Sequence, residues 1–419
     1  MRHWIELFDE TISVKEEVSL ELEAARMLAA NADRPIFFEN LNGHRAIGNL
    51  WSTRERICTA LEVDRMKLME NMIIAIENPS DPVLIDNAPF MEERTEIFDL
   101  RKLPIPRYYS ADGGRYITSA VVVGEFGDIR NLSFHRMMVL NQNQLAIRLI
   151  PRHLYALRQK AIEEEQDLKI AAVIGLCPSV LLPAAMSVGF GVDELRIANT
   201  LRKLCLGKEV EVSKAGNGVI VPAHAEIVLE GRITGKMIDE GPFVDITGTL
   251  DNVRKQPVVE IDAISMRKDP IMQLLLSAGP EHRLLMGMPK EPVILSAVRR
   301  VVPTVTGVNL TAGGCGWLHG VVSIEPQQEG DAKNAGMAAM AAHTSMKNVV
   351  IVNSDIDVFD PVQVEWAIAT RFQSHRDLLI IEGVRGSSLD PSAGETTSKM
   401  IMDATIKGPD VDSFKRINA

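Results

Sequence analysis

The spacing of hydrophobic and polar residues changes twice along the chain and divides it into three regions. In the first region, residues 16–31 and 66–77 place apolar side chains at helical spacing, and residues 34–38 form a short apolar run typical of a strand. The sequence LPIPR at residues 103–107 cannot continue a helix, because proline lacks a backbone N–H. We therefore predict a small N-terminal α/β domain over residues 1–105.

The middle region, residues 106–285, is dominated by short runs of β-branched residues. Helical spacing interrupts these runs at residues 153–167 and 192–204. Many strands with few helices favour a barrel-like sheet with helical insertions over a regular series of βαβ units. The predicted strands are residues 117–123, 145–150, 170–174, 225–229 and 258–264.

The last region, residues 286–419, alternates strand-like and helical segments, which indicates an α/β domain. Helices are expected at residues 331–343 and 362–371, and a final helix is expected at residues 398–405. The chain as a whole is thus predicted to have a mixed α/β (α+β) fold with three domains. The predicted strands of the last region are residues 293–298, 321–324, 349–352 and 378–381.

Composition excludes several classes of protein. The chain of 419 residues has a formal net charge of −11 and no basic run, which argues against a nucleic-acid partner. The four cysteines are widely scattered, which fits a reducing compartment better than a disulfide framework. The first residues contain no apolar signal core, and no run approaches the roughly 20 apolar residues that span a bilayer. We expect a cytoplasmic protein without a membrane span.

The six residues EGPFVD at positions 240–245 are the clearest chemical signal. A tight Gly-Pro turn between Glu240 and Asp245 can bring two carboxylates into one small volume. Like charges held close together in a partly dry site cannot both ionise easily, so one of the two tends to keep a proton. Such a pair suits general acid/base catalysis and requires a nearby cation.

Four other polar residues allow both a structural and a chemical interpretation. Asn131 and Arg136 lie in a segment patterned as a half-buried strand, where they are also typical of a solvated edge. His153 and Glu194 each stand where a helix is predicted to begin, a position that favours acidic side chains through the helix dipole. Asparagine, histidine and glutamate together would suit Mn²⁺ or Mg²⁺. Their spacing does not show that they converge.

The order of several short motifs resembles the UbiD family of prenylated-flavin-dependent decarboxylases over nearly the whole chain. Each motif is weakly specific alone, whereas their joint order is highly specific. The motifs are DGGRYI (112–117), NLSFHR (131–136), PRH (151–153), VDE (192–194), AEIVLEG (225–231), EGPF (240–243), DIDVF (355–359) and EWA (365–367).

The resemblance implies a fold, a cofactor and a set of partners. The fold would be a central split β-barrel flavin-binding domain at residues 106–285, flanked by N-terminal and C-terminal α/β domains. The cofactor would be prenylated FMN, held with Mn²⁺ (or Mg²⁺) and with K⁺ close by. The partners would be a small carboxylic acid substrate, a flavin prenyltransferase that supplies the cofactor, and further copies of the chain in a dimer or hexamer.

The resemblance also assigns roles to individual residues. Asn131, His153 and Glu194 fall where the family binds the divalent metal that holds the flavin phosphate. Arg136, Glu240 and Asp245 fall on the catalytic group, in which Arg136 pairs with the substrate carboxylate and Asp245 is the candidate proton donor. The remaining positions that match cofactor-binding residues are Ser133, Arg152, Ala185, Met186 and Lys399.

Within the family, the chain most resembles the compact archaeal members, and this resemblance indicates the substrate. Among those members are enzymes that convert trans-anhydromevalonate 5-phosphate, an α,β-unsaturated acid, to isopentenyl phosphate in a modified mevalonate pathway. A substrate phosphate needs cations, which His135, Arg148 or Arg152 could supply. The alternative is an aromatic acid of the 4-hydroxybenzoate type. A flavin-binding oxidoreductase or a non-catalytic cofactor-binding homologue is the alternative of another class, and it would not need Arg136 with two acids.

Overall fold

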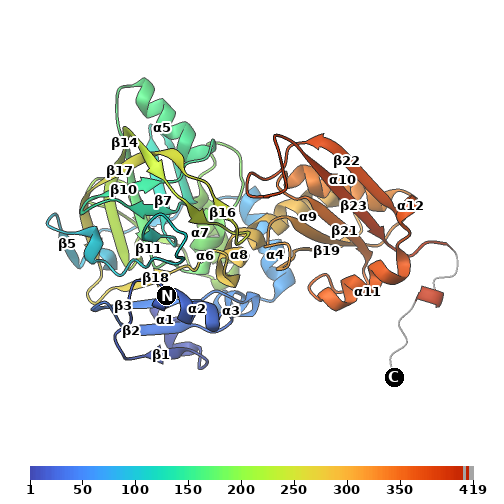
Figure 1. The fold of residues 1–419 in the computed structure, drawn as a ribbon, viewed down its shortest axis with the longest axis horizontal. Coiled ribbons are helices and arrows are strands. Elements are labelled where there is room, and N and C mark those ends of the chain that lie inside the picture. The colour runs from blue at the N-terminus through green and yellow to red at the C-terminus, as the bar shows by residue number, and fades with distance from the viewer. Residues whose placement is uncertain (409–411, 415–419) are drawn as a thin grey trace. The chain divides into compact units, whose positions relative to one another are not determined.

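The computed structural model describes residues 1–408 and 412–414 and falls into two compact units. The first unit is Met1–Leu285 and the second is Met286–Ala419. Figure 1 shows a mixed α/β fold in which each unit is built around its own sheets. Within the described part of the chain, no helix combines the length and the apolar character required to cross a bilayer.

A nine-stranded sheet forms the centre of the first unit. Its strands pair in the order β6-β9-β10-β17-β14-β11-β7-β8, with β5 added alongside β17, and every pairing is antiparallel. Each strand predicted in the middle region lies in this sheet or overlaps it. The bounds are β5 Glu93–Thr95, β6 Tyr116–Ile117, β7 Val121–Phe126, β8 Ile129–Phe134, β9 Met137–Val139, β10 Gln144–Ile147, β11 Leu168–Ile174, β14 Ile227–Glu240 and β17 Arg254–Met266.

Three helices pack against the β7–β8 end of this sheet. Helix α5 (His153–Glu163) contacts β7, β8 and β11, while α6 (Pro178–Ala184) and α7 (Glu194–Leu206) contact β8. Asp193 precedes helix α7, and its carboxylate accepts the N–H of Leu195, so the first turn of the helix is capped. The start of α7 is thereby fixed beside β8.

A second, four-stranded sheet belongs to the same unit. Its order is β1-β2-β3-β18, and β18 comes from far along the sequence to pair in parallel with β3. One apolar core joins side chains of this sheet to those of the nine-stranded sheet. The division of the unit at residue 105 remains a prediction. The bounds are β1 Ile12–Val14, β2 Ile36–Leu41, β3 His44–Gly48, β18 Ile271–Leu274, α1 Arg2–Leu7, α2 Glu23–Ala30, α3 Arg54–Ala60 and α4 Arg65–Glu77.

Smaller elements complete the first unit. Strands β4, β12 and β13 form a three-stranded sheet, and β15 and β16 form a hairpin. Helix α8 (Pro280–Gly287) spans the boundary between the units. The bounds are β4 Val83–Leu84, η1 Pro89–Met91, η2 Leu100–Lys102, β12 Glu211–Lys214, β13 Ile220–Pro222, β15 Phe243–Val244 and β16 Leu250–Asp251.

The second unit is a five-stranded sheet with helices packed against it. The strand order is β19-β20-β21-β23-β22, with parallel pairing from β20 through β21 to β23. Helices α10 and α11 confirm the predicted helices at residues 331–343 and 362–371. The bounds are η3 Met288–Lys290, α9 Glu291–Arg299, β19 Val305–Leu310, β20 His319–Ile324, α10 Asp331–Ala342, β21 Asn348–Asn353, α11 Pro361–Arg371, α12 Ser374–Asp377, β22 Leu378–Val384, β23 Thr397–Ala404 and η4 Asp412–Phe414.

Three element predictions were wrong in whole or in part. Residues 293–298, predicted as a strand, belong to helix α9, which begins with a proline at its first turn and buries an apolar face at helical spacing. Residues 398–405, predicted as a helix, form β23, which is hydrogen-bonded on both sides in the sheet. The helix predicted at residues 16–31 is limited to α2. In each case the packing partner, which comes from elsewhere in the sequence, decides the element.

Glu281 on α8 is a buried acid whose charge is favoured only weakly, by the nearby cation Arg56. Its side chain is 1% exposed, and its Oε1 accepts the backbone N–H of Trp51 at 2.9 Å. Among the described residues no lysine or arginine forms an ion pair with it, and burial raises the pKa of its carboxyl to about 7. Because folding raises this pKa from 4.5, the free energy of unfolding should fall as the pH rises between these two values.

We predict that Glu281→Gln removes this pH dependence. The variant should be more stable than the wild type at pH 8 by about 1–3 kcal/mol and similar to it at pH 5, because glutamine avoids the cost of ionising a buried acid. Thermal unfolding at the two pH values measures the difference. Glu77→Gln, on the exposed end of α4, is the matched control. Equal pH slopes for wild type and Glu281→Gln would contradict the prediction.

Candidate active site

The turn between Glu240 and Asp245 is held in place by the Asp-Gly-Gly motif at residues 112–114. Strand β14 ends at Glu240, and the turn leads into the β15–β16 hairpin. The N–H of Gly113 donates to the Pro242 carbonyl at 2.7 Å, and the carboxylate of Asp112 accepts the Val244 N–H at 3.0 Å. The motif thus binds the turn from both sides.

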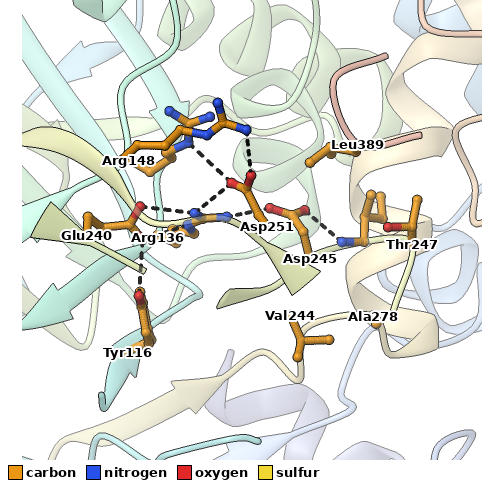
Figure 2. Close-up of polar contacts among 12 residues, drawn as sticks. Tyr116, Arg136, Arg148, Glu240, Val244, Asp245, Thr247, Asp251, Ala278 and Leu389 are labelled. Atoms are coloured by element: carbon orange, nitrogen blue, oxygen red, sulfur yellow. Dashed lines mark hydrogen bonds and ion pairs between the residues drawn. The ribbon is translucent and has the colours of Figure 1, made fainter. Parts of the chain in front are cut away.

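Arg136 lies at the centre of the acids and contacts both members of the predicted pair (Figure 2). It lies in the two-residue break between β8 and β9, so the alternation of side chains along either strand does not fix the direction of its side chain. Its Nε and Nη2 donate to the two carboxylate oxygens of Glu240 at 2.9 and 3.0 Å. Its Nη1 donates to Asp245 at 2.6 Å. The structure therefore brings Arg136, Glu240 and Asp245 into one cluster.

Asp251 is a third acid of this cluster, which the sequence analysis missed. It lies opposite Phe243 in the β15–β16 hairpin, and its Oδ2 accepts a hydrogen bond from Arg136 Nη2 at 2.9 Å. The same oxygen is 3.6 Å from Arg148 Nε, and the other oxygen accepts from Arg254 at 3.0 Å. The signal that could have revealed it is the turn-forming sequence TGT at residues 247–249, which returns the chain toward Phe243.

Burial and charge determine the protonation of these groups. Burial alone would lower the pKa of the Arg136 guanidinium, but hydrogen bonding and attraction from Glu240, Asp245 and Asp251 outweigh burial and raise it. Arg136 is therefore charged at every relevant pH.

Burial and the neighbouring Glu240 raise the pKa of Tyr116, whose hydroxyl donates to Glu240 at 3.1 Å. Burial tends to raise the pKa of Asp251 as well, but hydrogen bonds from Arg254 and Arg136 bring it below the usual value. Tyr116 thus remains a protonated hydrogen-bond donor, and Asp251 remains a carboxylate.

A second polar cluster joins Asn131, His153 and Glu194, which are far apart in the sequence. Glu194 opens α7, and its carboxylate accepts the Asn131 side-chain N–H at 3.0 Å and the Leu132 backbone N–H at 2.8 Å. The Nδ1 atom of His153, at the start of α5, lies 3.6 Å from Glu194 Oε1. The structure thus supplies the convergence that the spacing could not show.

The donor atoms of this second cluster fit a divalent cation. They are a carboxylate, an imidazole nitrogen and the Asn131 Oδ1, which accepts a hydrogen bond from Ser133 at 2.8 Å. This mixed oxygen and nitrogen set is one that Mn²⁺ and Mg²⁺ accept. No group of three or more histidine, cysteine and acidic side chains that could hold a metal occurs among the described residues, so this cluster depends on the asparagine oxygen as its third donor.

The remaining predicted cofactor residues lie in several elements. Ser133 is on β8 beside Asn131, and Ala185 and Met186 are buried where α6 ends. Arg152 is exposed before α5 and donates to the Ser187 hydroxyl at 3.2 Å. Lys399 is on β23 in the second unit, where its ammonium donates to the Thr344 carbonyl at 2.7 Å and burial lowers its pKa.

The family models that match this chain cover most of its length. The 3-octaprenyl-4-hydroxybenzoate carboxy-lyase (UbiD) Rift-related domain matches residues 83–280, and the corresponding N-terminal and C-terminal domains match residues 3–76 and 283–404.

Individual proteins also match over the full chain. Anhydromevalonate phosphate decarboxylase of Methanothermobacter thermautotrophicus is 43% identical over 100% of this chain and 99% of its own. The UbiD-class enzyme HmfF from Pelotomaculum thermopropionicum, solved in complex with FMN, matches with a TM-score of 0.95 and 38% identity over 100% of this chain and 97% of its own. An evolved dimeric form of HmfF with prFMN matches with a TM-score of 0.91 and 36% identity over 100% and 96%.

We predict that Gly113→Ala disrupts the turn that holds the paired acids. A Cβ at this position would lie 2.2 Å from the Gly241 carbonyl oxygen, which is backbone and cannot move aside. The free energy of unfolding should fall by about 1–3 kcal/mol, as for other overpacked sites. Gly114→Ala is the control, since its Cβ would meet only the flexible Met138 side chain at 3.3 Å. Denaturant unfolding that shows equal stability for the two variants would refute this role of Gly113.

Proposed function

The chain belongs to the UbiD family of carboxy-lyases, and from this we propose that it decarboxylates trans-anhydromevalonate 5-phosphate to isopentenyl phosphate with prenylated FMN as cofactor. The chain is a decarboxylase on the evidence of its family. The observation that supports this choice of substrate is the similarity to an anhydromevalonate phosphate decarboxylase over essentially the full length of both chains. The cluster around Arg136 supplies the groups that such a reaction requires.

The second cluster would hold the cofactor. Asn131, His153 and Glu194 would bind a divalent ion, Mn²⁺ or Mg²⁺, that in turn binds the flavin phosphate, with K⁺ as a possible neighbour. Ser133, Arg152, Ala185, Met186 and Lys399 would contact the cofactor. When bound, prenylated FMN supplies the electron sink that accepts the electron pair released as CO₂ departs.

Arg136 has one N–H left to orient the substrate carboxylate. A guanidinium carries five N–H donors, and the contacts to Glu240, Asp245 and Asp251 occupy four of them. The remaining N–H is on Nη1, the nitrogen that also donates to Asp245. A substrate carboxylate that binds Nη1 would therefore lie next to Asp245. This position orients the carboxylate and places an acid beside it.

Asp245 is the better candidate to deliver the proton that replaces CO₂. Glu240 is completely buried and is fixed by two hydrogen bonds from Arg136 and one from Tyr116. The Asp245 side chain is 18% exposed and accepts one hydrogen bond from Arg136 and one from the neighbouring Ile246 N–H, so water can reach it and it is held by fewer side chains than Glu240. We infer that Glu240 holds Arg136 in place and that Asp245 is the general acid.

Two further candidates remain. The description of the matching family domain favours an aromatic acid of the 4-hydroxybenzoate type as the second candidate substrate. An oxidoreductase or a cofactor-storing homologue would have no use for a buried arginine with three acids.

We also propose a cytoplasmic location, which is consistent with the four free cysteines. We further propose that a separate flavin prenyltransferase supplies the cofactor and that the chain forms a homo-oligomer.

The substrate proposal is tested with protein co-expressed with a flavin prenyltransferase and purified without oxygen. We expect release of CO₂ and isopentenyl phosphate from trans-anhydromevalonate 5-phosphate, and no turnover of 4-hydroxybenzoate. Gas detection of CO₂ with mass spectrometry of the product measures both reactions. Turnover of the aromatic acid alone would reject the proposed substrate in favour of the alternative.

Loss of the general acid should slow the reaction without unfolding the protein. We predict that Asp245→Asn lowers kcat by about 10²- to 10⁴-fold, the usual contribution of general acid catalysis. Asp239→Asn is the matched control, since Asp239 lies on β14, near the turn that leads to Asp245, with its side chain 62% exposed and paired to Lys255. Steady-state kinetics of the loaded enzyme provide the measurement. A kcat for Asp245→Asn within a factor of two of the control would exclude Asp245 as proton donor.

Metal binding should depend on the second cluster. We predict that Glu194→Gln weakens Mn²⁺ binding by at least about 100-fold, because it removes the anionic ligand of the site. Even the loss of a residue that only supports a metal ligand typically weakens metal affinity by about 10- to 100-fold. The purified protein should lose its manganese and much of its flavin absorbance. Glu163→Gln, on the exposed end of α5, controls for the change of charge. Full metal content in Glu194→Gln, measured by mass spectrometry of the metal, would show that the ion binds elsewhere.

A further inference from the structure

Arg148 is a second cation beside Arg136, and no step of the proposed reaction uses it. We propose that Arg148 binds the phosphate of the substrate while Arg136 binds its carboxylate, so that this pair of arginines selects acids with a second anionic group. The inference rests on the proposed function, because it concerns the substrate of the same site.

The two arginines face the same side of the sheet. Strands β9 and β10 pair so that Met137 lies opposite Ile147, and the next pair outward is Arg136 and Arg148, whose backbones are joined by a 3.1 Å hydrogen bond. Like charges directly opposite each other on neighbouring strands repel. Asp251 relieves this repulsion, since one of its oxygens lies between the two guanidiniums, as Figure 2 shows.

Asp251 does not occupy all the hydrogen-bond donors of the Arg148 guanidinium. Its Oδ2 is closer to Arg136, at 2.9 Å, than to Arg148, at 3.6 Å, and its Oδ1 accepts a hydrogen bond from Arg254. Within the described residues, Asp251 is the only side chain in an ion pair with Arg148, and both Nη groups of Arg148 lack a protein acceptor. The Arg148 side chain is nevertheless only 17% exposed. Burial, together with repulsion from Arg136 and Arg254, lowers the pKa of this guanidinium in spite of the attraction from Asp251.

The charges of the cluster point to an anionic group at Arg148. Three arginines (Arg136, Arg148 and Arg254) face three acids (Glu240, Asp245 and Asp251), but in the described part of the chain every arginine hydrogen bond to these acids comes from Arg136 or Arg254, which leaves Arg148 the least compensated of the three cations. A substrate whose only charge is its carboxylate would need Arg136 alone. A phosphate oxygen can accept the paired N–H groups that Arg148 presents, in the planar geometry that favours guanidinium over ammonium.

The other cations predicted for this role are less suitable. His135 is neutral, because burial lowers the pKa of its ring to about 4, and both of its nitrogens are already hydrogen-bonded, to Ser133 and to the Arg148 carbonyl. Arg152 is exposed and contacts Ser187. Arg283, which was not among the predicted cations, is a rival from the structure, since its Nε donates to the Ile246 carbonyl at 3.4 Å in the loop that carries Asp245.

The test compares two substrates that differ only in the phosphate. Cofactor-loaded wild type, Arg148→Gln, Arg148→Lys and Arg283→Gln are assayed with trans-anhydromevalonate 5-phosphate and with unphosphorylated trans-anhydromevalonate. We expect Arg148→Gln to lower the ratio of the two kcat/KM values by about 10- to 100-fold, the effect of one charge-assisted contact, mainly through KM of the phosphorylated acid. Arg148→Lys should recover part of the ratio, and Arg283→Gln should keep it within about threefold.

Binding to the cofactor-free protein provides an independent readout. Calorimetric titration with isopentenyl phosphate should show weaker binding to Arg148→Gln than to Arg283→Gln, after thermal unfolding has shown that both variants are folded. A ratio that Arg148→Gln leaves within twofold of wild type, or that Arg283→Gln lowers instead, would overturn the inference while leaving the proposed function intact. If the wild type turns over neither acid, the proposed function itself fails.

Discussion

The candidate site depends on the burial of one guanidinium. Arg136 has a side chain only 8% exposed, and a charge removed from water to this degree is stable only when carboxylates and hydrogen bonds replace its hydration. Three acids provide this replacement: Glu240 at the end of β14, Asp245 after β15, and Asp251 in β16. The turn, the hairpin and the break between β8 and β9 must all form correctly for Arg136 to be paired, so this ion cluster couples the local geometry of the site to the nine-stranded sheet.

The segment from Asn131 to Arg136 connects the acid cluster to the proposed cofactor site. Asn131 lies in β8 and contacts Glu194, and Arg136 follows five residues later, just beyond the end of the strand. Asn131 thus turns toward α7, whereas Arg136 turns toward the β15–β16 hairpin. One short stretch of chain therefore supplies a metal-ligand candidate and the candidate substrate-binding cation. This arrangement would fix the distance between the cofactor and the group that orients the substrate, which is the contribution a protein makes when the cofactor performs the chemistry.

Sequence reasoning predicted much of the fold and part of the site. The paired acids, their need for a cation and most strands followed from local patterns, because turns and strands are encoded within a few residues. Asp251 was missed although the turn-forming residues 247–249 hint at its return toward Phe243, and the closeness of Arg148 to Arg136 depends on pairing between strands, which no local pattern contains. The convergence of Asn131, His153 and Glu194 came from the family resemblance and not from spacing. The errors at residues 293–298 and 398–405 have the same cause, since packing partners decided helix α9 and strand β23.

The central claim is that Arg136 holds the substrate carboxylate beside an acid that replaces CO₂ with a proton. The most direct test is turnover of trans-anhydromevalonate 5-phosphate by the loaded enzyme in D₂O, followed by NMR of the isopentenyl phosphate formed. The account predicts one deuterium per molecule, bound to the carbon that lost CO₂ and present in a single stereochemical position, because Asp245 lies on one side of the bound acid. Deuterium distributed over both positions, or none at that carbon, would contradict it.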